Sequence, residues 1–334
     1  MSAVQLVGID VSAKTLQICL QTSTGSVESL ELPNSAEGHR QLCRKLSQRG
    51  RRARIGLEAT GMYSLDLALA LSRQPRLEVM VINPRAVRDF ARACLKRSKT
   101  DVLDAQTLLE FVRRMPFQPW QPPSAEQVEL RALARRMASL TATRTQEKNR
   151  LHAASASAEL SSALRQDLEL SIEQLEHRID WLLQQALALI DSNQELKKAF
   201  EILTSIPGFA EKSGVQVLAE LTVLPQDMTA RQWVAHTGID PRHLESGTSV
   251  HKPARISRTG NRHLRAALYM PALVAIQRDQ HVKAFYNQLL ARGKAPMQAN
   301  VAVMRKLLHS LHAMLRTGTH FESHKFRVLE VVGA

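Results

Sequence analysis

The stretch VQLVGIDVSAKTLQICLQTSTGSVESLEL, residues 4–32, contains three short runs rich in apolar and β-branched residues. Residues 4–10, 15–21 and 27–32 each have the length and composition of a β-strand, and turn-forming residues separate them. The second run follows the first closely enough to be its hairpin partner. The sequence therefore predicts a domain that begins with three consecutive strands.

Helices and strands alternate after this stretch. We expect a helix at residues 36–48, a strand at 54–58, a helix at 63–72, a strand at 77–82, and helices after Pro84 and Thr100. Three leading strands followed by alternating helices and strands are the order expected of an RNase H-like sheet. The N-terminal part is thus predicted to be an α/β domain of that kind.

A long helical segment is predicted for the middle of the chain. Residues 124–206 contain neither Gly nor Pro, whereas Pro122, Pro123 and Pro207 bracket them. Apolar residues recur there at alternating spacings of four and three, as in the a/d seam of a coiled coil: Leu168, Ile172, Leu175, Ile179, Leu182, Ala186 and Leu189. Either a second chain or another helix of the same chain, in an intramolecular hairpin, would cover this seam.

The net charge is strongly positive and unevenly distributed. The formal net charge of +14 and the pI near 10.2 make a polyanion, first of all a nucleic acid, the expected partner. Residues 1–123 hold 18 Lys and Arg against 11 Asp and Glu, residues 124–204 hold 10 against 12, and residues 205–334 hold 17 against 8. We therefore expect two nucleic-acid-contacting domains, 1–123 and 205–334, joined by a helical connector, 124–204, that acts as scaffold.

Two carboxylates are placed at predicted strand ends. Asp10 ends the first strand and Glu58 ends the fourth. A carboxylate buried without a partner costs several kcal/mol, so a bound cation is a natural reason for these positions.

A second pair of carboxylates, Asp101 and Asp104, is spaced to lie on one face at the start of a helix that Thr100 caps. Four oxygen ligands suit Mg²⁺ or Mn²⁺, and two such ions stabilise the attacking and leaving oxygens of a phosphodiester. Stabilisation of the helix N-terminus is the alternative role for Asp101. Nearby cations are candidates for holding a nucleic-acid backbone, although a solvated basic face is the alternative: Lys96, Arg97 and Lys99.

The three cysteines show no paired spacing, which favours a reducing cytoplasm. The N-terminus lacks a basic region ahead of an apolar run, and no segment approaches eighteen continuous apolar residues. Export and membrane insertion are not expected.

The four carboxylates, with Asn83-Pro84-Arg85 and the block 99–105, closely resemble the insertion-sequence 110 family of transposases, also called DEDD transposases. The resemblance covers nearly the whole chain. It implies a RuvC-like N-terminal domain in which Asp10, Glu58, Asp101 and Asp104 bind divalent metal.

The C-terminal half supports the same resemblance through residues 205–209, 238–241 and 246–249 and looks like the family's mainly helical transposase domain. There the resemblance implies a serine nucleophile that links covalently to DNA, with Ser246 as the match and Ser249 as the alternative. Cations that follow this serine are candidates for contacting the phosphate: Lys252, Arg255, Arg258, Arg262 and Arg265. Residues 206–209 also resemble the turn of a helix-hairpin-helix that holds a DNA phosphate, or they form a plain structural turn.

The resemblance further implies a noncoding bridge RNA that pairs with donor and target DNA, and we expect the chain to form a dimer or tetramer. Two other functions stay open. One is a RuvC-type endonuclease that hydrolyses DNA junctions without a serine, and the other is a noncatalytic nucleic-acid-binding scaffold. A covalent protein–DNA intermediate separates the first from a recombinase, and metal-dependent strand cleavage excludes the second.

Overall fold

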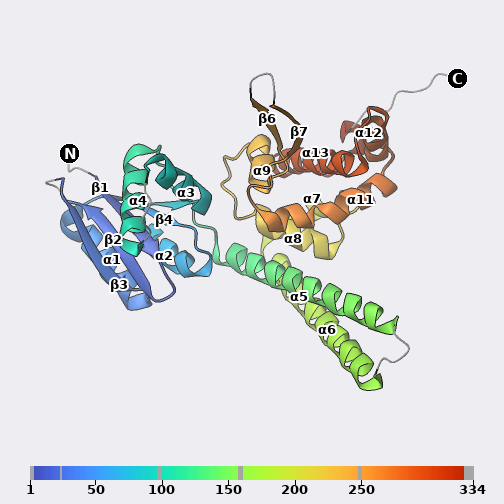
Figure 1. Ribbon diagram of the computed structural model, residues 1–334, viewed down its shortest axis with the longest axis horizontal. Coiled ribbons are helices and arrows are strands. Elements are labelled where there is room, and N and C mark those ends of the chain that lie inside the picture. Colours follow the sequence, from blue (N-terminus) through green and yellow to red (C-terminus); the bar gives the residue numbers. More distant parts are fainter. Residues whose placement is uncertain (1–3, 23–24, 96–99, 157–160, 247–249, 327–334) are drawn as a thin grey trace. The chain divides into compact units, whose positions relative to one another are not determined.

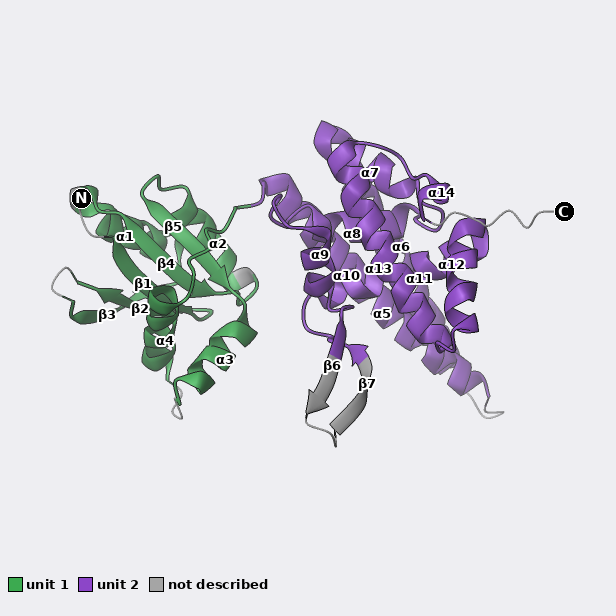
Figure 2. Cartoon of the chain, turned by 90° about the horizontal axis from the view of Figure 1, so that it is seen from above, with its two compact units in different colours: residues 1–122 green, residues 123–334 purple. Residues whose placement is uncertain are grey.

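The chain forms two compact units, Met1–Pro122 and Pro123–Ala334 (Figures 1 and 2). The structure, a computed structural model, describes residues 4–22, 25–95, 100–156, 161–246 and 250–326, without the side chains of Arg49, Met62 and residues 243–254. The boundary after Pro122 lies close to the predicted one after residue 123. The further division of the second unit at residue 204 stays a prediction.

A five-stranded mixed sheet forms the centre of the first unit, with the strand order β3-β2-β1-β4-β5. Its strands are β1 (Gln5–Val11), β2 (Thr15–Gln21), β3 (Val27–Pro33), β4 (Ala53–Glu58) and β5 (Leu77–Ile82). The first three strands are antiparallel neighbours in the sheet, whereas β4 runs parallel to both β1 and β5. The predicted strands, including the hairpin of the first two, are confirmed.

Helices cover both faces of this sheet because its strands carry apolar side chains on both sides. The helices of the first unit are α1 (Ala36–Ser47), η1 (Gln48–Gly50), α2 (Met62–Ser72), α3 (Pro84–Ala93) and α4 (Asp101–Arg114). Side chains of α1 and α2 pack into one apolar cluster with Val7, Ile9 and Ile55 of the sheet. Side chains of α3 and α4 pack on the other face with Leu6 and Met80. The predicted helices are also confirmed.

Helix α4 lies directly on the sheet because two glycines leave room for it. Gly8 and Gly56 are register partners on β1 and β4. A Cβ atom at Gly8 would overlap the backbone of Ala105 and Leu109, and one at Gly56 would overlap the side chain of Val112. The missing side chains therefore set the distance between helix and sheet.

The second unit is built mainly from helices around one continuous hydrophobic cluster, in which residues of α5 and α6 pack together with the later helices. Its elements are α5 (Ala125–Ser155), α6 (Ser162–Ser192), α7 (Gln194–Thr204), α8 (Glu211–Leu221), α9 (Ala230–Thr237), β6 (Pro241–Ser246), β7 (Val250–Ile256), α10 (Arg262–Ala267), α11 (Tyr269–Arg278), α12 (Gln280–Ala291), α13 (Pro296–Thr317) and α14 (Ser323–Phe326). The antiparallel hairpin of β6 and β7 is the second sheet that the structure describes.

The predicted apolar seam is buried within the chain. Figure 1 shows α5 and α6 side by side as a long helical hairpin, and these two helices make the most extensive contact between elements. Six of the seven seam residues are buried, and Leu189 is partly buried against the core. The intramolecular alternative is therefore what the structure shows, and a coiled coil between chains stays untested.

The turn between α7 and α8 is a packing element. Gly208 has a φ of +105°, and a Cβ atom there would overlap the carbonyl of Pro271 in α11. Ile206 and Phe209 are buried on either side of it. The structural-turn alternative accounts for this close approach, and Glu211 in the first turn of α8 disfavours an anion at that helix end.

Among the described residues no helix combines the length and apolar character needed to cross a bilayer.

Replacing Gly8 tests the contact between α4 and the sheet. We expect Gly8→Ala to destabilise the first unit by about 3 kcal/mol, because the new methyl group meets helix backbone that cannot yield locally. The control Gly25→Ala adds a methyl group in open space at a φ of +87° and should cost about 1 kcal/mol. Urea unfolding followed by hydrogen exchange of the β1 amides measures both; equal effects would contradict the packing argument.

Candidate functional site

Asp10 and Glu58 lie side by side at the carboxyl ends of two parallel strands. The register of β1 and β4 pairs Ile9 with Leu57, and the next residue along each strand is a carboxylate. Asp10 precedes the last residue of β1, and Glu58 is the last residue of β4. Both side chains are half-buried.

Both carboxylates belong to the sheet face that α4 covers. Side chains alternate between the two faces of a strand, so residues two apart share a face. Gly8 and Gly56 face α4, and Asp10 and Glu58 each follow by two residues. Helix α4 therefore covers the two glycines, and the two carboxylates lie two residues farther along the same face.

Helix α4 crosses the strands of this face. Val102 near its start lies beside Cys19 of β2, Ala105 and Leu109 lie over Gly8 of β1, and Val112 lies over Gly56 of β4. The helix that carries Asp101 and Asp104 is therefore fixed on the sheet face to which Asp10 and Glu58 belong.

Asp101 and Asp104 lie one helical turn before Ala105 and Leu108, the residues that approach the glycines. Thr100 caps the helix by accepting a hydrogen bond from the Leu103 amide at 3.3 Å, as predicted. The backbone thus places all four predicted carboxylates on the side of the sheet that α4 covers.

The side chains do not form a closed metal cage in this structure. Among the described residues no group of three or more His, Cys, Asp or Glu side chains lies close enough to hold a metal ion. Asp101 is exposed, and Asp104 is half-buried. The donor chemistry suits Mg²⁺ or Mn²⁺, since all four candidates offer carboxylate oxygens. Lys96, Arg97 and Lys99 lie outside the described residues.

The β6–β7 hairpin carries the candidate serine in the second unit. Ser246 is the last residue of β6, and its backbone pairs with Val250. Its side chain, Ser249 and the side chain of Lys252 lie outside the description. The base of the hairpin is fixed by Ser257, which donates from its hydroxyl to Asp240 Oδ1 at 2.6 Å and from its amide to the Asp240 carbonyl at 2.9 Å.

The predicted cations beyond the hairpin differ in their surroundings. Arg255, Arg258 and Arg262 are exposed. Arg265 instead donates from Nη1 to the carbonyl of Thr237 at 2.8 Å, so it stabilises the C-terminal end of α9. Arg265 therefore has a structural role in addition to its positive charge.

A buried polar network lies next to this hairpin, and the sequence reasoning missed it. Glu220 on α8 is only 2% exposed. Arg135 on α5 donates to both of its carboxylate oxygens, at 2.6 and 2.9 Å, and Asn261 donates to one of them at 2.7 Å. The signal in the sequence was a single glutamate within the otherwise apolar residues 217–221; its partners are 41 and 85 residues away.

Asn261 connects this network to the hairpin. Its side-chain Oδ1 accepts hydrogen bonds from the backbone amides of His263 and Leu264 and so caps α10. Its backbone amide donates to the carbonyl of His236 at 2.6 Å. α10 begins a few residues after β7 ends. The ion pair therefore holds α5, α8 and the start of α10 together beside the hairpin base.

Burial and hydrogen bonding oppose each other at Glu220. Burial by itself raises the pKa of this carboxyl, but the hydrogen bonds from Arg135 and Asn261 outweigh it and bring the pKa below its usual value of 4.5. Burial lowers the pKa of His236 and, aided by Arg135, that of His263. Glu220 is therefore charged and both histidines are neutral at pH 7.

Comparison with known sequences connects both units to mobile DNA. Residues 7–155 match the DEDD model of the IS110 group, which is described as Transposase, and residues 200–287 match the model described as Transposase IS116/IS110/IS902 family. The first match contains all four candidate carboxylates, and the second contains Ser246 and the cations that follow it.

Individual relatives support the same connection. The chain is 28% identical over 323 residues to the pilin gene-inverting protein of Moraxella bovis. This alignment covers 95% of this chain and 97% of that protein. It is also 35% identical over 140 residues to the insertion element IS110 uncharacterized 43.6 kDa protein of Streptomyces coelicolor, covering 41% of this chain and 33% of that protein.

These matches place the chain in the class of DNA-processing enzymes that recombine DNA, the transposases. Within that class, the chain belongs to the IS110 family of transposases.

Removing Arg135 tests the buried network. We expect Arg135→Met to destabilise the second unit by about 3 kcal/mol, since it leaves the Glu220 charge buried without its ion-pair partner. Arg136→Met is the control, because Arg136 is exposed and outside the network. Chemical unfolding at pH 7 measures the difference.

The pH dependence follows from the lowered pKa of Glu220. A carboxyl whose pKa is lower in the folded state contributes stability that is full above its unfolded value, near 4.5, and is lost as pH falls through the folded value. In Arg135→Met the hydrogen bonds from Arg135 that lower the pKa of Glu220 are lost and burial raises it, so protonating this carboxyl costs less folding stability than in the wild type. The difference in stability between wild type and variant should therefore shrink as pH falls below 4.5, and a difference that does not change with pH would contradict this assignment.

Proposed function

We propose that this transposase cuts and rejoins DNA strands with a divalent metal site formed by Asp10, Glu58, Asp101 and Asp104 and with Ser246 as the nucleophile. The observation that carries the proposal is that Asp10 and Glu58 lie on neighbouring strands of the sheet face that α4, the helix with Asp101 and Asp104, covers. The strand order of the sheet further supports an RNase H-like, RuvC-like domain. Coverage of nearly the whole Moraxella relative supports the use of both units in one reaction.

The carboxylates supply metal ligands from two elements in this scheme. Asp10 and Glu58 present oxygen ligands from the sheet, and Asp101 and Asp104 present them from the helix. Bound Mg²⁺ or Mn²⁺ supplies positive charge to the oxygens of the reacting phosphodiester. The glycine contact under α4 holds the two sources of ligands in register.

Ser246 performs the strand exchange. Its Oγ gives up a proton and forms a bond to phosphorus, while the bond from phosphorus to one sugar oxygen breaks and that oxygen takes up a proton. Attack by the hydroxyl of another strand then reverses the step and frees the serine. Because one phosphate ester replaces another, rejoining needs no external energy source. Exposed Arg255, Arg258 and Arg262 neutralise the phosphate charge during these steps.

We further propose that a bridge RNA selects the donor and target DNA and that the chain works as a dimer or tetramer. The net charge of +14 supports a nucleic-acid-rich complex. A composite site, with the carboxylates of one protomer and the serine of another, would restrict cutting to the assembled complex.

Covalent capture tests the proposal. Protein, RNA, Mg²⁺ and labelled donor and target DNA are incubated and denatured, and protein-linked DNA is measured for the wild type, Ser246→Ala and Asp10→Asn. We expect an adduct with the wild type and a loss of at least ~100-fold in both variants, because each removes a group needed in the transition state. EDTA should abolish the adduct, and Mn²⁺ should restore it.

Two outcomes would contradict parts of this proposal. DNA cleavage without an adduct, retained in Ser246→Ala, would show a hydrolytic RuvC-type nuclease instead. An adduct that persists in EDTA and in Asp10→Asn would remove the metal site from the reaction. Ser249→Ala is the matched control, and an adduct lost only in that variant would move the nucleophile to Ser249.

A further inference from the structure

The second unit contains a cleft of about 860 Å³ between α5 and the helices α8, α10, α11 and α13. Polar side chains from four of these helices line it: Ser139, Gln216, Arg262, His263 and Tyr269. None of these five side chains hydrogen-bonds to another residue within the described parts of the chain. They are available to a ligand from both walls of the cleft.

The chemistry of these side chains matches a nucleic-acid backbone. Contacts to phosphate and sugar oxygens in protein–DNA complexes come from arginine and from hydroxyl and amide side chains. The cleft contains Arg135, Arg262 and Arg265 against the single acid Glu220, so its lining is net positive. Tyr269 is the single Phe, Tyr or Trp residue among the described lining residues, which disfavours recognition by base stacking.

The floor of the cleft is rigid. Arg135 and Glu220 both line it and are joined by two hydrogen bonds, and Asn261 joins the same carboxylate from the start of α10. Arg262 and His263 are the first two residues of that helix. The buried network therefore holds the unpartnered side chains of α10 at a set position opposite α5.

The cleft leads to the hairpin that carries Ser246. Ile239, just before β6, and Ile256, the last residue of β7, are both part of its lining. A strand that follows the cleft therefore arrives at the hairpin base.

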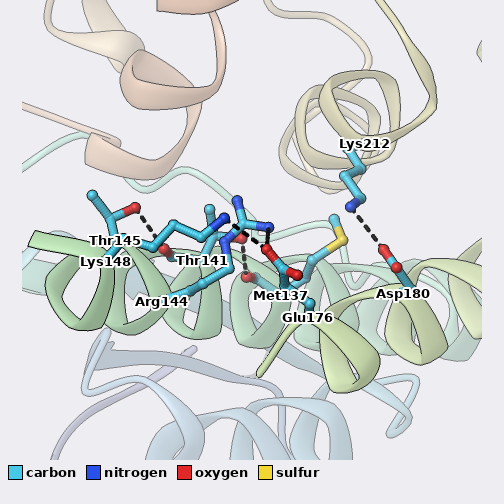
Figure 3. Close-up of polar contacts among 8 residues, drawn as sticks. All are labelled: Met137, Thr141, Arg144, Thr145, Lys148, Glu176, Asp180 and Lys212. Atoms are coloured by element: carbon cyan, nitrogen blue, oxygen red, sulfur yellow. Dashed lines mark hydrogen bonds and ion pairs between the residues drawn. The ribbon is translucent and has the colours of Figure 1, made fainter. Parts of the chain in front are cut away.

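The hairpin of α5 and α6 is polarised in charge, which the average over residues 124–204 hides. α5 carries six Lys and Arg against three Asp and Glu, whereas α6 carries two against six. Figure 3 shows Arg144 and Lys148 of α5 sharing the single carboxylate of Glu176 on α6, at 3.5 and 2.7 Å. Thr141 and Thr145, which line the cleft, are on the same part of α5.

We propose that this cleft binds the sugar-phosphate backbone of one DNA strand and guides it to the β6–β7 hairpin, with α5 as one wall. The helical connector is then part of the DNA-binding surface as well as scaffold. The inference rests on the proposed function only for the destination of the strand, because backbone binding in the cleft requires neither the metal nor the serine.

The test measures DNA binding without chemistry. The full chain carrying Ser246→Ala, in EDTA, is titrated with labelled single-stranded DNA by fluorescence anisotropy at several salt concentrations. On this background, Arg262→Gln removes a cation from the cleft, and Arg278→Gln is the control because Arg278 is exposed at the end of α11, outside the lining. We expect Arg262→Gln to weaken binding by ~10-fold and to lower the salt slope by about 1, with no change in the control.

A second pair of variants tests the α5 wall. Ser139→Glu places a negative charge in the cleft, and Gln146→Glu places the same charge on an exposed position of α5 outside it. Ser139→Glu should weaken binding by ~10-fold, and Gln146→Glu should have a much smaller effect. Both positions are on the surface, so equal thermal midpoints check the fold.

Three results would overturn the inference. Unchanged affinity and salt slope in both cleft variants would show that no strand binds there. A loss seen with RNA of the same length but not with DNA would assign the cleft to RNA, and a loss of self-association by sedimentation would assign it to a second copy of the chain. Because Ser246 is already replaced and metal is absent, none of these results depends on the covalent-capture experiment.

Discussion

The contact of helix α4 with the paired glycines Gly8 and Gly56 is the constraint on which the first unit depends. Because no Cβ separates the helix from the sheet, the helix backbone reaches the strands themselves. That closeness places Ala105, Leu109 and Val112 of α4 directly on β1 and β4, so the helix that carries Asp101 and Asp104 is fixed on the sheet face to which Asp10 and Glu58 belong.

The second unit depends on a different kind of contact at its centre. A buried carboxylate, Glu220, is tolerated because Arg135 and Asn261 satisfy both of its oxygens. Those partners come from α5 and from the residue that caps α10, so one charged group orients three elements around the hairpin. An apolar residue at this position would fill the space but would not specify the orientation of the start of α10.

Charge in the connector differs between its two helices, a difference that the net charge of the segment hides. The connector as a whole is slightly acidic, yet α5 is basic and α6 is acidic, and ion pairs such as Lys212 with Asp180 join the acidic helix to its neighbours (Figure 3). The basic helix is the one that lines the cleft. A surface for DNA can therefore continue from the C-terminal helices onto the connector without any change in the overall charge of the segment.

The sequence by itself determined the order of strands and helices, the cap at Thr100, the apolar seam and the family, since these depend on local spacing and on short motifs. Tertiary structure alone decided that α5 covers the seam, that Arg265 stabilises α9, and that Glu220 pairs with Arg135 85 residues away. The packing of α4 on Gly8 and Gly56 was likewise decided by the tertiary structure, because the glycines do not specify which helix lies on them. Long-range contacts of this kind depend on how elements pack, and no local pattern in the chain encodes their partners.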